Sequence, residues 1–63
     1  MEKIIYINLD TFLDIQSQDE TTHRKCLKLL KEIQNQGYQF YIKSNNGISG
    51  FNINDDYSII THD

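Results

Sequence analysis

Apolar and polar side chains alternate and then meet a turn signal in the stretch Tyr38-Gln39-Phe40-Tyr41-Ile42-Lys43-Ser44-Asn45-Asn46-Gly47. A period of two is typical of a strand with one buried face. Asn46-Gly47 is a strong hairpin signal, because both residues tolerate a positive φ. A second strand follows from Ile48, with Phe51 and Ile53 on one face. We therefore predict a hairpin with strands at residues 38–43 and 48–53.

Two further strands are predicted toward the two ends of the sequence. β-Branched and aromatic side chains dominate residues 3–9, which favours a strand that is apolar on both faces. Asn54-Asp55-Asp56 indicates a turn, after which residues 57–61 can form the last strand. Residues 10–16 fit neither the strand period nor the helix period, so we expect a loop or a short helical turn there.

One amphipathic helix is predicted between the first two strands. Ser17-Gln18-Asp19-Glu20 matches a capping box, and Gly37 is a natural helix end. The apolar stripe of this helix consists of Cys26, Leu27, Leu29, Leu30 and Ile33. The expected fold is α+β with the order β-α-β-β-β, in which one helix covers one face of a mostly antiparallel sheet. Whether the first strand runs parallel or antiparallel to its neighbour stays open.

The chain has 63 residues, which we interpret as a single domain, residues 1–63, near the lower size limit for independent folding. Small domains often gain stability from disulfides, a metal or association. Cys26 is the only cysteine, and His23 and His62 are the only histidines, so the sequence offers no disulfide and no zinc ligand set. We therefore expect no metal and no cofactor, and we expect a homo-oligomer or a protein partner.

The net charge of −3 argues against general binding to nucleic acid phosphates. The cations are nevertheless unevenly placed, because Arg24, Lys25, Lys28 and Lys31 put four of the six on the predicted helix. We interpret Arg24, Lys28 and Lys31 as a basic, solvated helix face. Steering of a charged partner is the alternative.

The apolar run from Ile4 to Leu9 is far too short to span a membrane, and it contains Tyr6 and Asn8. It also lacks the pattern of a signal peptide. A single cysteine, Cys26, fits a reducing compartment. We therefore expect a cytoplasmic protein with no membrane contact.

The first 46 residues resemble the opening of a haloacid dehalogenase-like phosphohydrolase. In that family an apolar strand ends in Asp-x-Asp-Gly-Thr-Leu, and a later helix with Gly-Tyr leads into a strand that ends in Ser or Thr followed by Asn. Here the matching segments are Asn8-Leu9-Asp10-Thr11-Phe12-Leu13 and the helix to Gly37-Tyr38, followed by Ser44-Asn45.

This resemblance implies an acid/base position at Asp10 and a phosphate-binding hydroxyl at Ser44. Asn8 stands at the nucleophile position of the family, and an amide is not a nucleophile for phosphoryl transfer. The chain also ends before the lysine and the late acidic pair that help to bind magnesium in the family, an acid cluster that this chemistry needs. The resemblance therefore implies a phosphorylated ligand that is bound without catalysis, and we do not expect an enzyme.

Two other pairs have the residue types of a chemical site. Asp10 and Asp14 could flank a site as paired carboxylates, but solvated loop residues are the simpler interpretation. His23 and Cys26 are three apart on the predicted helix and could form a metal pair or a nucleophile and base. Cys26 lies within the apolar stripe, so we expect an inert core thiol instead.

The strands carry more apolar surface than one helix can cover. One face can be formed by Ile5, Ile7, Leu9, Phe40, Ile42, Phe51 and Ile53. The remaining apolar residues, which we predict to form an interface, are Ile4, Tyr6, Phe12, Tyr41 and Ile60. We therefore expect a protein-binding module, an inhibitor or regulator of the kind that phages or other mobile elements encode, which dimerises through the open face or a strand edge.

Overall fold

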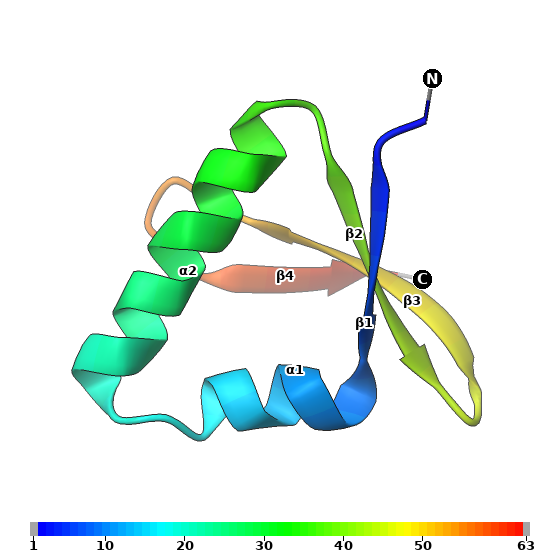
Figure 1. Cartoon of the computed structure of the whole chain (residues 1–63), viewed down its shortest axis with the longest axis horizontal. Coiled ribbons are helices and arrows are strands. Elements are labelled where there is room, and N and C mark those ends of the chain that lie inside the picture. Colours follow the sequence, from blue (N-terminus) through cyan, green and yellow to red (C-terminus); the bar gives the residue numbers. More distant parts are fainter. Residues whose placement is uncertain (1, 63) are drawn as a thin grey trace.

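Four strands form one sheet, and two helices lie against one of its faces (Figure 1). The computed structural model of the chain describes residues 2–62. The elements are β1 (Ile4–Asn8), α1 (Leu9–Gln16), α2 (Glu20–Asn35), β2 (Gln39–Ser44), β3 (Gly47–Ile53) and β4 (Ile59–His62). The α+β class and the mostly antiparallel sheet are confirmed. The expectation of a single helix is wrong, because residues 9–16 form a helix of their own.

The strands lie in the order β1-β2-β3-β4, so that β1 and β4 form the two edges. β1 runs parallel to β2, with Ile4 opposite Gln39, and the two helices form the crossover connection that parallel strands require. β2 and β3 are antiparallel, with Phe40 opposite Phe51, and β3 and β4 are antiparallel as well. The predicted antiparallel arrangement of the last three strands is therefore confirmed.

Helix α1 corrects two of the sequence predictions. It begins directly after Asn8, which is still extended, and it turns Phe12 into the core, where its ring lies 5.3 Å from that of Phe51. Phe12 was predicted as an interface residue, but it is buried. Leu9 was predicted on the core face of the first strand, but it is the first residue of α1 and is exposed.

The second helix begins two residues later than the capping box predicted. Asp19 is the N-cap of α2, and its carboxylate accepts a hydrogen bond from the N–H of Thr22 at 2.8 Å. Ser17 instead caps the end of α1, because that helix already extends to Gln16. The predicted end of the helix is confirmed, since Gly37 follows it with a φ of 99°.

The core lies between the helices and the covered face of the sheet. Its buried members are Phe12, Leu27, Phe40, Ile42, Phe51 and Ile53. The rings of Phe40 and Phe51 stack at 5.2 Å across β2 and β3. From α2, Leu27 reaches this core, whereas Leu29 of the predicted stripe is 61% exposed. Cys26 is only half-buried, so it is not the core thiol that was expected.

The hairpin between β2 and β3 is confirmed with a different set of turn residues. Ser44 pairs with Gly47, so the turn consists of Asn45 and Asn46. Within this hairpin, Gly47 has a positive φ of 133°, but Asn46 does not. The register that follows from this turn places Phe40 and Ile42 on the same face of the sheet as Phe51 and Ile53.

Candidate functional site

The face of the sheet that the helices leave uncovered is called the open face here. Side chains of neighbouring strand residues alternate between faces, and the register assigns to it Ile4, Tyr6, Asn8, Gln39, Tyr41, Lys43, Ile48, Gly50, Asn52, Ile60 and His62. Three of its large apolar side chains are strongly exposed: Tyr6 by 55%, Ile48 by 54% and Ile60 by 45%. The open face is therefore a broad, partly apolar surface.

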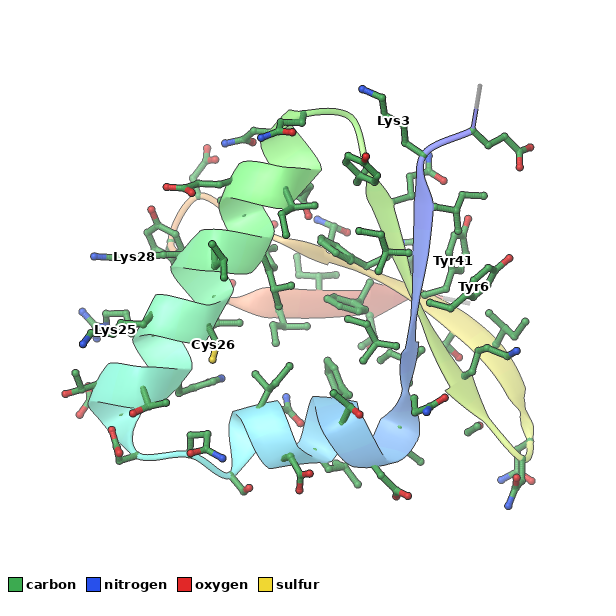
Figure 2. The ribbon with its side chains drawn as sticks, viewed as in Figure 1. Lys3, Tyr6, Lys25, Cys26, Lys28 and Tyr41 are labelled. Atoms are coloured by element: carbon green, nitrogen blue, oxygen red, sulfur yellow. The ribbon has the colours of Figure 1, made fainter. Side chains whose placement is uncertain are left out.

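Tyr6 and Tyr41 form an aromatic pair on this face. They are direct neighbours in the register of β1 and β2, and their ring centroids lie 5.8 Å apart. Figure 2 shows both rings pointing away from the helices. The Nζ of Lys43 lies 5.6 Å from the ring centroid of Tyr6, which is close enough for a cation–π interaction.

Gly50 interrupts the row of side chains beside this pair. It lies between Tyr41 of β2 and His62 of β4, and it is buried. A Cβ at this position would lie 2.6 Å from Cε1 of His62, so the imidazole occupies the space above the glycine. The His62 ring therefore fills the gap that Gly50 leaves beside Tyr41 on the open face.

The open face differs in charge from the rest of the protein. Lys43 is its one lysine, and none of its residues is acidic. The carboxylates of the described part of the chain lie before β1, on the helices, at the N-cap of α2 and in the loop before β4: Glu2, Asp10, Asp14, Asp19, Glu20, Glu32, Asp55 and Asp56. Among residues 2–62, a chain with a net charge of −3 thus places no negative side chain on this face of its sheet.

Four of the five predicted interface residues lie on the open face, namely Ile4, Tyr6, Tyr41 and Ile60. Their role in an interface stays a prediction. Sequence reasoning did not assign Ile48 to this face. The signal was present, because Ile48 has the opposite parity to Phe51 and Ile53 in one strand.

Asp10 and Ser44 line one cleft of about 340 Å³ at the carboxyl ends of β1 and β2, together with Asn8, Leu9, Lys43 and Asn45. The Ser44 hydroxyl already has partners in the hairpin, because it accepts from the N–H of Asn46 and donates to the C=O of Gly47, both at 3.3 Å. The Asn8 side chain makes no capping hydrogen bond to α1. The first N–H groups of α1 therefore lie uncapped beside this cleft.

The chain was compared with protein-family models, with curated proteins and with solved structures. None of the three comparisons gives a match.

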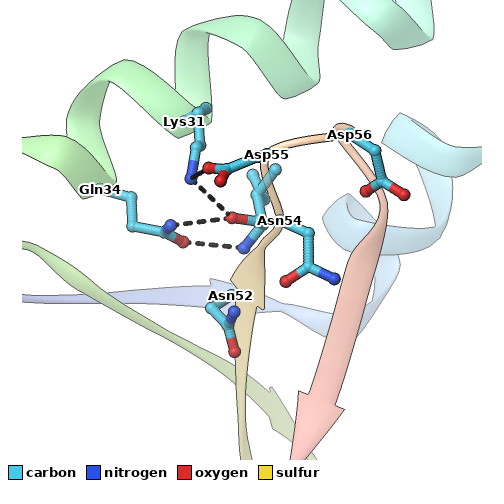
Figure 3. A pocket seen from close by; sticks show the side chains of 7 residues that line it. Lys31, Gln34, Asn52, Asn54, Asp55 and Asp56 are labelled. Carbon is cyan, nitrogen blue, oxygen red and sulfur yellow. Dashed lines mark hydrogen bonds and ion pairs between the residues drawn. The ribbon is translucent and has the colours of Figure 1, made fainter.

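The predicted basic helix face is not continuous. The Nζ of Lys31 is bound to the C=O of Ile53 at 3.0 Å and to Asp55 at 3.3 Å, and the Lys31 side chain is only 17% exposed (Figure 3). Arg24 pairs with Glu20 at 3.3 Å on the surface. Lys28 is exposed on the same helix. Because Lys31 serves the packing of α2, the three residues do not form one solvated basic surface.

His23 and Cys26 do not assemble into a larger site. Among residues 2–62, no group of three or more His, Cys, Asp or Glu side chains is placed to hold a metal ion. Nε2 of His23 is buried without a hydrogen-bond partner, in the wall of a hollow that Leu27 and Tyr57 also line. Within the same part of the chain, no helix combines the length and apolarity needed to cross a membrane.

Proposed function

We propose that this chain is a protein-binding module that acts through its open face, as an inhibitor or regulator and not as an enzyme. The single observation that supports this is the exposure of Tyr6, Ile48 and Ile60 around Tyr41 on a face that no helix covers. Exposed apolar side chains gathered on one face often mark an interaction site on a small protein.

The composition of the open face fits a protein partner better than nucleic acid. Burial of apolar surface stabilises a complex by roughly 25 cal/mol per Å², and tyrosine is enriched in protein interfaces. Single-stranded nucleic acid also stacks on aromatic side chains, but it needs a positively charged groove beside them. Lys43 is the one lysine on this face, whereas three isoleucines, Ile4, Ile48 and Ile60, share the face with the tyrosine pair.

Two further parts of the proposal concern the setting of the protein. We place it in the cytoplasm, where the half-buried thiol of Cys26 would stay reduced. We also suggest that a phage or another mobile element encodes it, because such elements use small binding modules to regulate other proteins. Both parts rest on size and composition.

Photo-crosslinking from single positions tests the proposal. A benzoylphenylalanine residue would replace Ile48 or Ile60 on the open face, or Leu29 on α2 as the matched control, since Leu29 is at least as exposed. We expect a discrete protein adduct from Ile48 and Ile60 in cells, its loss when Tyr6→Lys is added, and no such adduct from Leu29. Equal adducts from all three positions, or none from the open face, would contradict the proposal.

A second candidate function is binding of a phosphorylated ligand without catalysis in the cleft that holds Asp10 and Ser44. The observation that favours it is the meeting of these two residues with Lys43 at the uncapped start of α1. Helix N-termini and lysines both bind phosphate groups. Magnesium at Asp10 would offset the repulsion between its carboxylate and the phosphate.

Thermal unfolding with inorganic phosphate and magnesium tests this second candidate. Binding to the folded state raises the melting temperature as the ligand concentration rises. We expect the increase to disappear in Asp10→Ala and Ser44→Ala but to persist in Asp14→Ala, which lies one helical turn further along α1. An increase that is equal in all of these variants, or absent in the wild type, would end this candidate.

A further inference from the structure

β1 is the most apolar strand of the sheet, yet none of its side chains is buried. Ile4, Ile5 and Ile7 are half-buried, and Tyr6 is exposed. The central strands behave differently, because β2 buries Phe40 and Ile42 and β3 buries Phe51 and Ile53. Near-continuous apolar strands that run parallel to a neighbour are normally covered on both sides. In a single copy of this chain, β1 is covered on only one of its two faces.

The free edge of β1 also presents unpaired backbone groups. The N–H of Gln39 donates to the C=O of Lys3 at 2.8 Å, and Ile4 lies opposite Gln39. In a parallel ladder of this register, N–H and C=O groups of Lys3, Ile5 and Ile7 face β2. The N–H groups of Ile4, Tyr6 and Asn8 therefore point away from the sheet, ready to pair with another strand.

Nothing in β1 blocks such pairing. Edge strands are usually protected by a charge, a proline, a bulge or short length. Ile4–Asn8 contains neither a charge nor a proline and pairs with β2 in an uninterrupted register. The opposite edge, β4, has four residues and includes Thr61 and His62. Of the two edges in the described part of the chain, β1 is therefore the longer and the more apolar.

We propose that a second copy of this chain pairs with β1 through its own β1, antiparallel and about a two-fold axis at Tyr6. Tyr6 would lie opposite Tyr6 of the second copy, and Ile4 opposite Asn8 of the second copy. The two sheets would become one sheet of twice the width, and the two open faces would form one surface. This inference names the partner of the β1 edge, leaves the joined open faces for the protein partner, and rests on the proposed function.

The shape of the molecule fits this contact. Its extents are 30 × 26 × 16 Å, and the strands lie behind one another along the shortest axis (Figure 1). The edge of β1 therefore lies on the broad side of the molecule, between α1, α2 and the open face. A standard dimer buries about 800 Å² on each partner. A side with extents of 30 × 26 Å can supply an area of that order.

The charges beside β1 are complementary in an antiparallel pair. Lys3 comes just before the strand, and Asp10 comes just after it, on the first turn of α1. Two-fold pairing brings Lys3 of each copy toward Asp10 of the other. The Nζ of Lys3 donates to the C=O of Gln36 at 2.9 Å, and an ammonium group has further protons to donate. A parallel pair would instead bring the two Lys3 side chains together.

Amide hydrogen exchange tests the inference on the unmodified chain. We expect the Ile4 and Tyr6 amides to exchange freely in dilute solution and to gain at least about tenfold protection as sedimentation shows dimer formation. The amide of Ile48 is the control for this exchange measurement, because Ile48 lies on β3, two strands away from β1. If a dimer forms while the Ile4 and Tyr6 amides stay unprotected, or if the chain stays monomeric at millimolar concentration, the inference is overturned.

Paired variants separate edge pairing from stacking of two open faces. Ile4→Pro removes the outward N–H without touching the ladder to β2, and Ile4→Ala removes the side chain but keeps that N–H. Because each copy loses one hydrogen bond, we expect Ile4→Pro to raise the dimer Kd at least about tenfold. Ile4→Ala and Ile60→Lys should change it less, by about threefold. The reverse pattern, with Ile60→Lys dissociating the dimer and Ile4→Pro retaining it, would refute edge pairing.

The test of edge pairing and the test of the proposed function can fail independently of each other. A monomer that still gives adducts from Ile48 and Ile60 would refute the second copy and retain protein binding by the open face. A β1-paired dimer without such adducts would support edge pairing and contradict the proposed function. Circular dichroism of Ile4→Pro, together with exchange data on the wild type, shows whether loss of dimer reflects loss of fold.

Discussion

Gln34 of α2 and Ile53 of β3 are joined by two hydrogen bonds. The Gln34 amide donates to the C=O of Ile53 at 2.9 Å and accepts from its N–H at 2.8 Å. Ile53 lies beyond the end of β2, because the register places Phe51 opposite Phe40 and β2 begins at Gln39. The side-chain amide thus takes the place of a missing strand neighbour (Figure 3).

Replacing this amide should destabilise the fold. Gln34→Ala leaves the part-buried N–H of Ile53 without its hydrogen-bond acceptor and removes one of the two donors to the C=O of Ile53. We therefore expect a loss of about 1–3 kcal/mol in the free energy of unfolding. Asn35→Ala, on the exposed neighbour, is the control and should change it by less than about 0.5 kcal/mol. Urea unfolding measures both. Equal midpoints for the two variants would show that the Gln34–Ile53 link contributes nothing.

Replacing Lys31 should destabilise the fold more than replacing Lys28, although both residues lie on α2. Lys31→Ala removes the hydrogen bond to the C=O of Ile53 and the ion pair with Asp55, and we expect it to cost about 1 kcal/mol. Lys28→Ala should cost less than about 0.5 kcal/mol, since Lys28 is exposed. The measurement is chemical unfolding at two salt concentrations. If Lys28→Ala is the more costly change, the assignment of Lys31 to the α2–β3 junction is wrong.

Gly50 and His62 should be energetically coupled. Gly50→Ala places a methyl group against the His62 ring, so we expect it to destabilise the wild type by about 1 kcal/mol. In a His62→Ala background the same change should be neutral or stabilising, because alanine is favoured over glycine in a strand by roughly 0.5–1 kcal/mol. A double-mutant cycle in urea measures this coupling. Additive effects would mean that the ring does not occupy the space above Gly50.

Protonation of two carboxylates in acid should lower the stability of the fold. Hydrogen bonds from the backbone N–H and the hydroxyl of Thr22 lower the pKa of Asp19, and those from the hydroxyl and N–H of Ser58 lower the pKa of Asp56. A folded pKa below the unfolded value of about 3.9 gives stability that is present above that pH and is lost as pH falls through the folded pKa.

Unfolding measured between pH 6 and pH 2 checks this expectation. Asp19→Asn combined with Asp56→Asn should flatten the decline in stability below about pH 4, because an amide does not titrate. The wild type should show the steeper decline. An identical slope for the combined variant and the wild type would show that other groups control acid unfolding.

Periodicity and turn chemistry predicted much of the sheet. Phe40, Ile42, Phe51 and Ile53 alternate strictly, and the register of the hairpin puts all four into the core. The end of α2 was also predictable, since Gly37 supplies the positive φ that follows the helix. The open-face positions of Tyr6 and Tyr41 followed from the same alternation.

The first helix was not predictable from local signals. Phe12 and Ile15 are spaced for a helix, but Leu9 and Leu13 are apolar and exposed, which blurs the pattern. Ser17 and Asp19 are both residue types that cap the start of a helix. Because α1 extends to Gln16, Ser17 caps the end of α1 and Asp19 caps the start of α2. The site depends on this helix, because α1 places Asp10 beside Ser44 and removes Phe12 from the surface.

The connection between β1 and β2 has a kinetic consequence. Ile4 finds its neighbour Gln39 more than half of the chain away, whereas β2, β3 and β4 follow one another through short turns. Local pairings form faster than those that must close a long loop. The three-stranded meander can therefore assemble first, and β1 docks only after both helices have folded back, which makes it the strand that a newly made or partly unfolded chain offers longest to its surroundings.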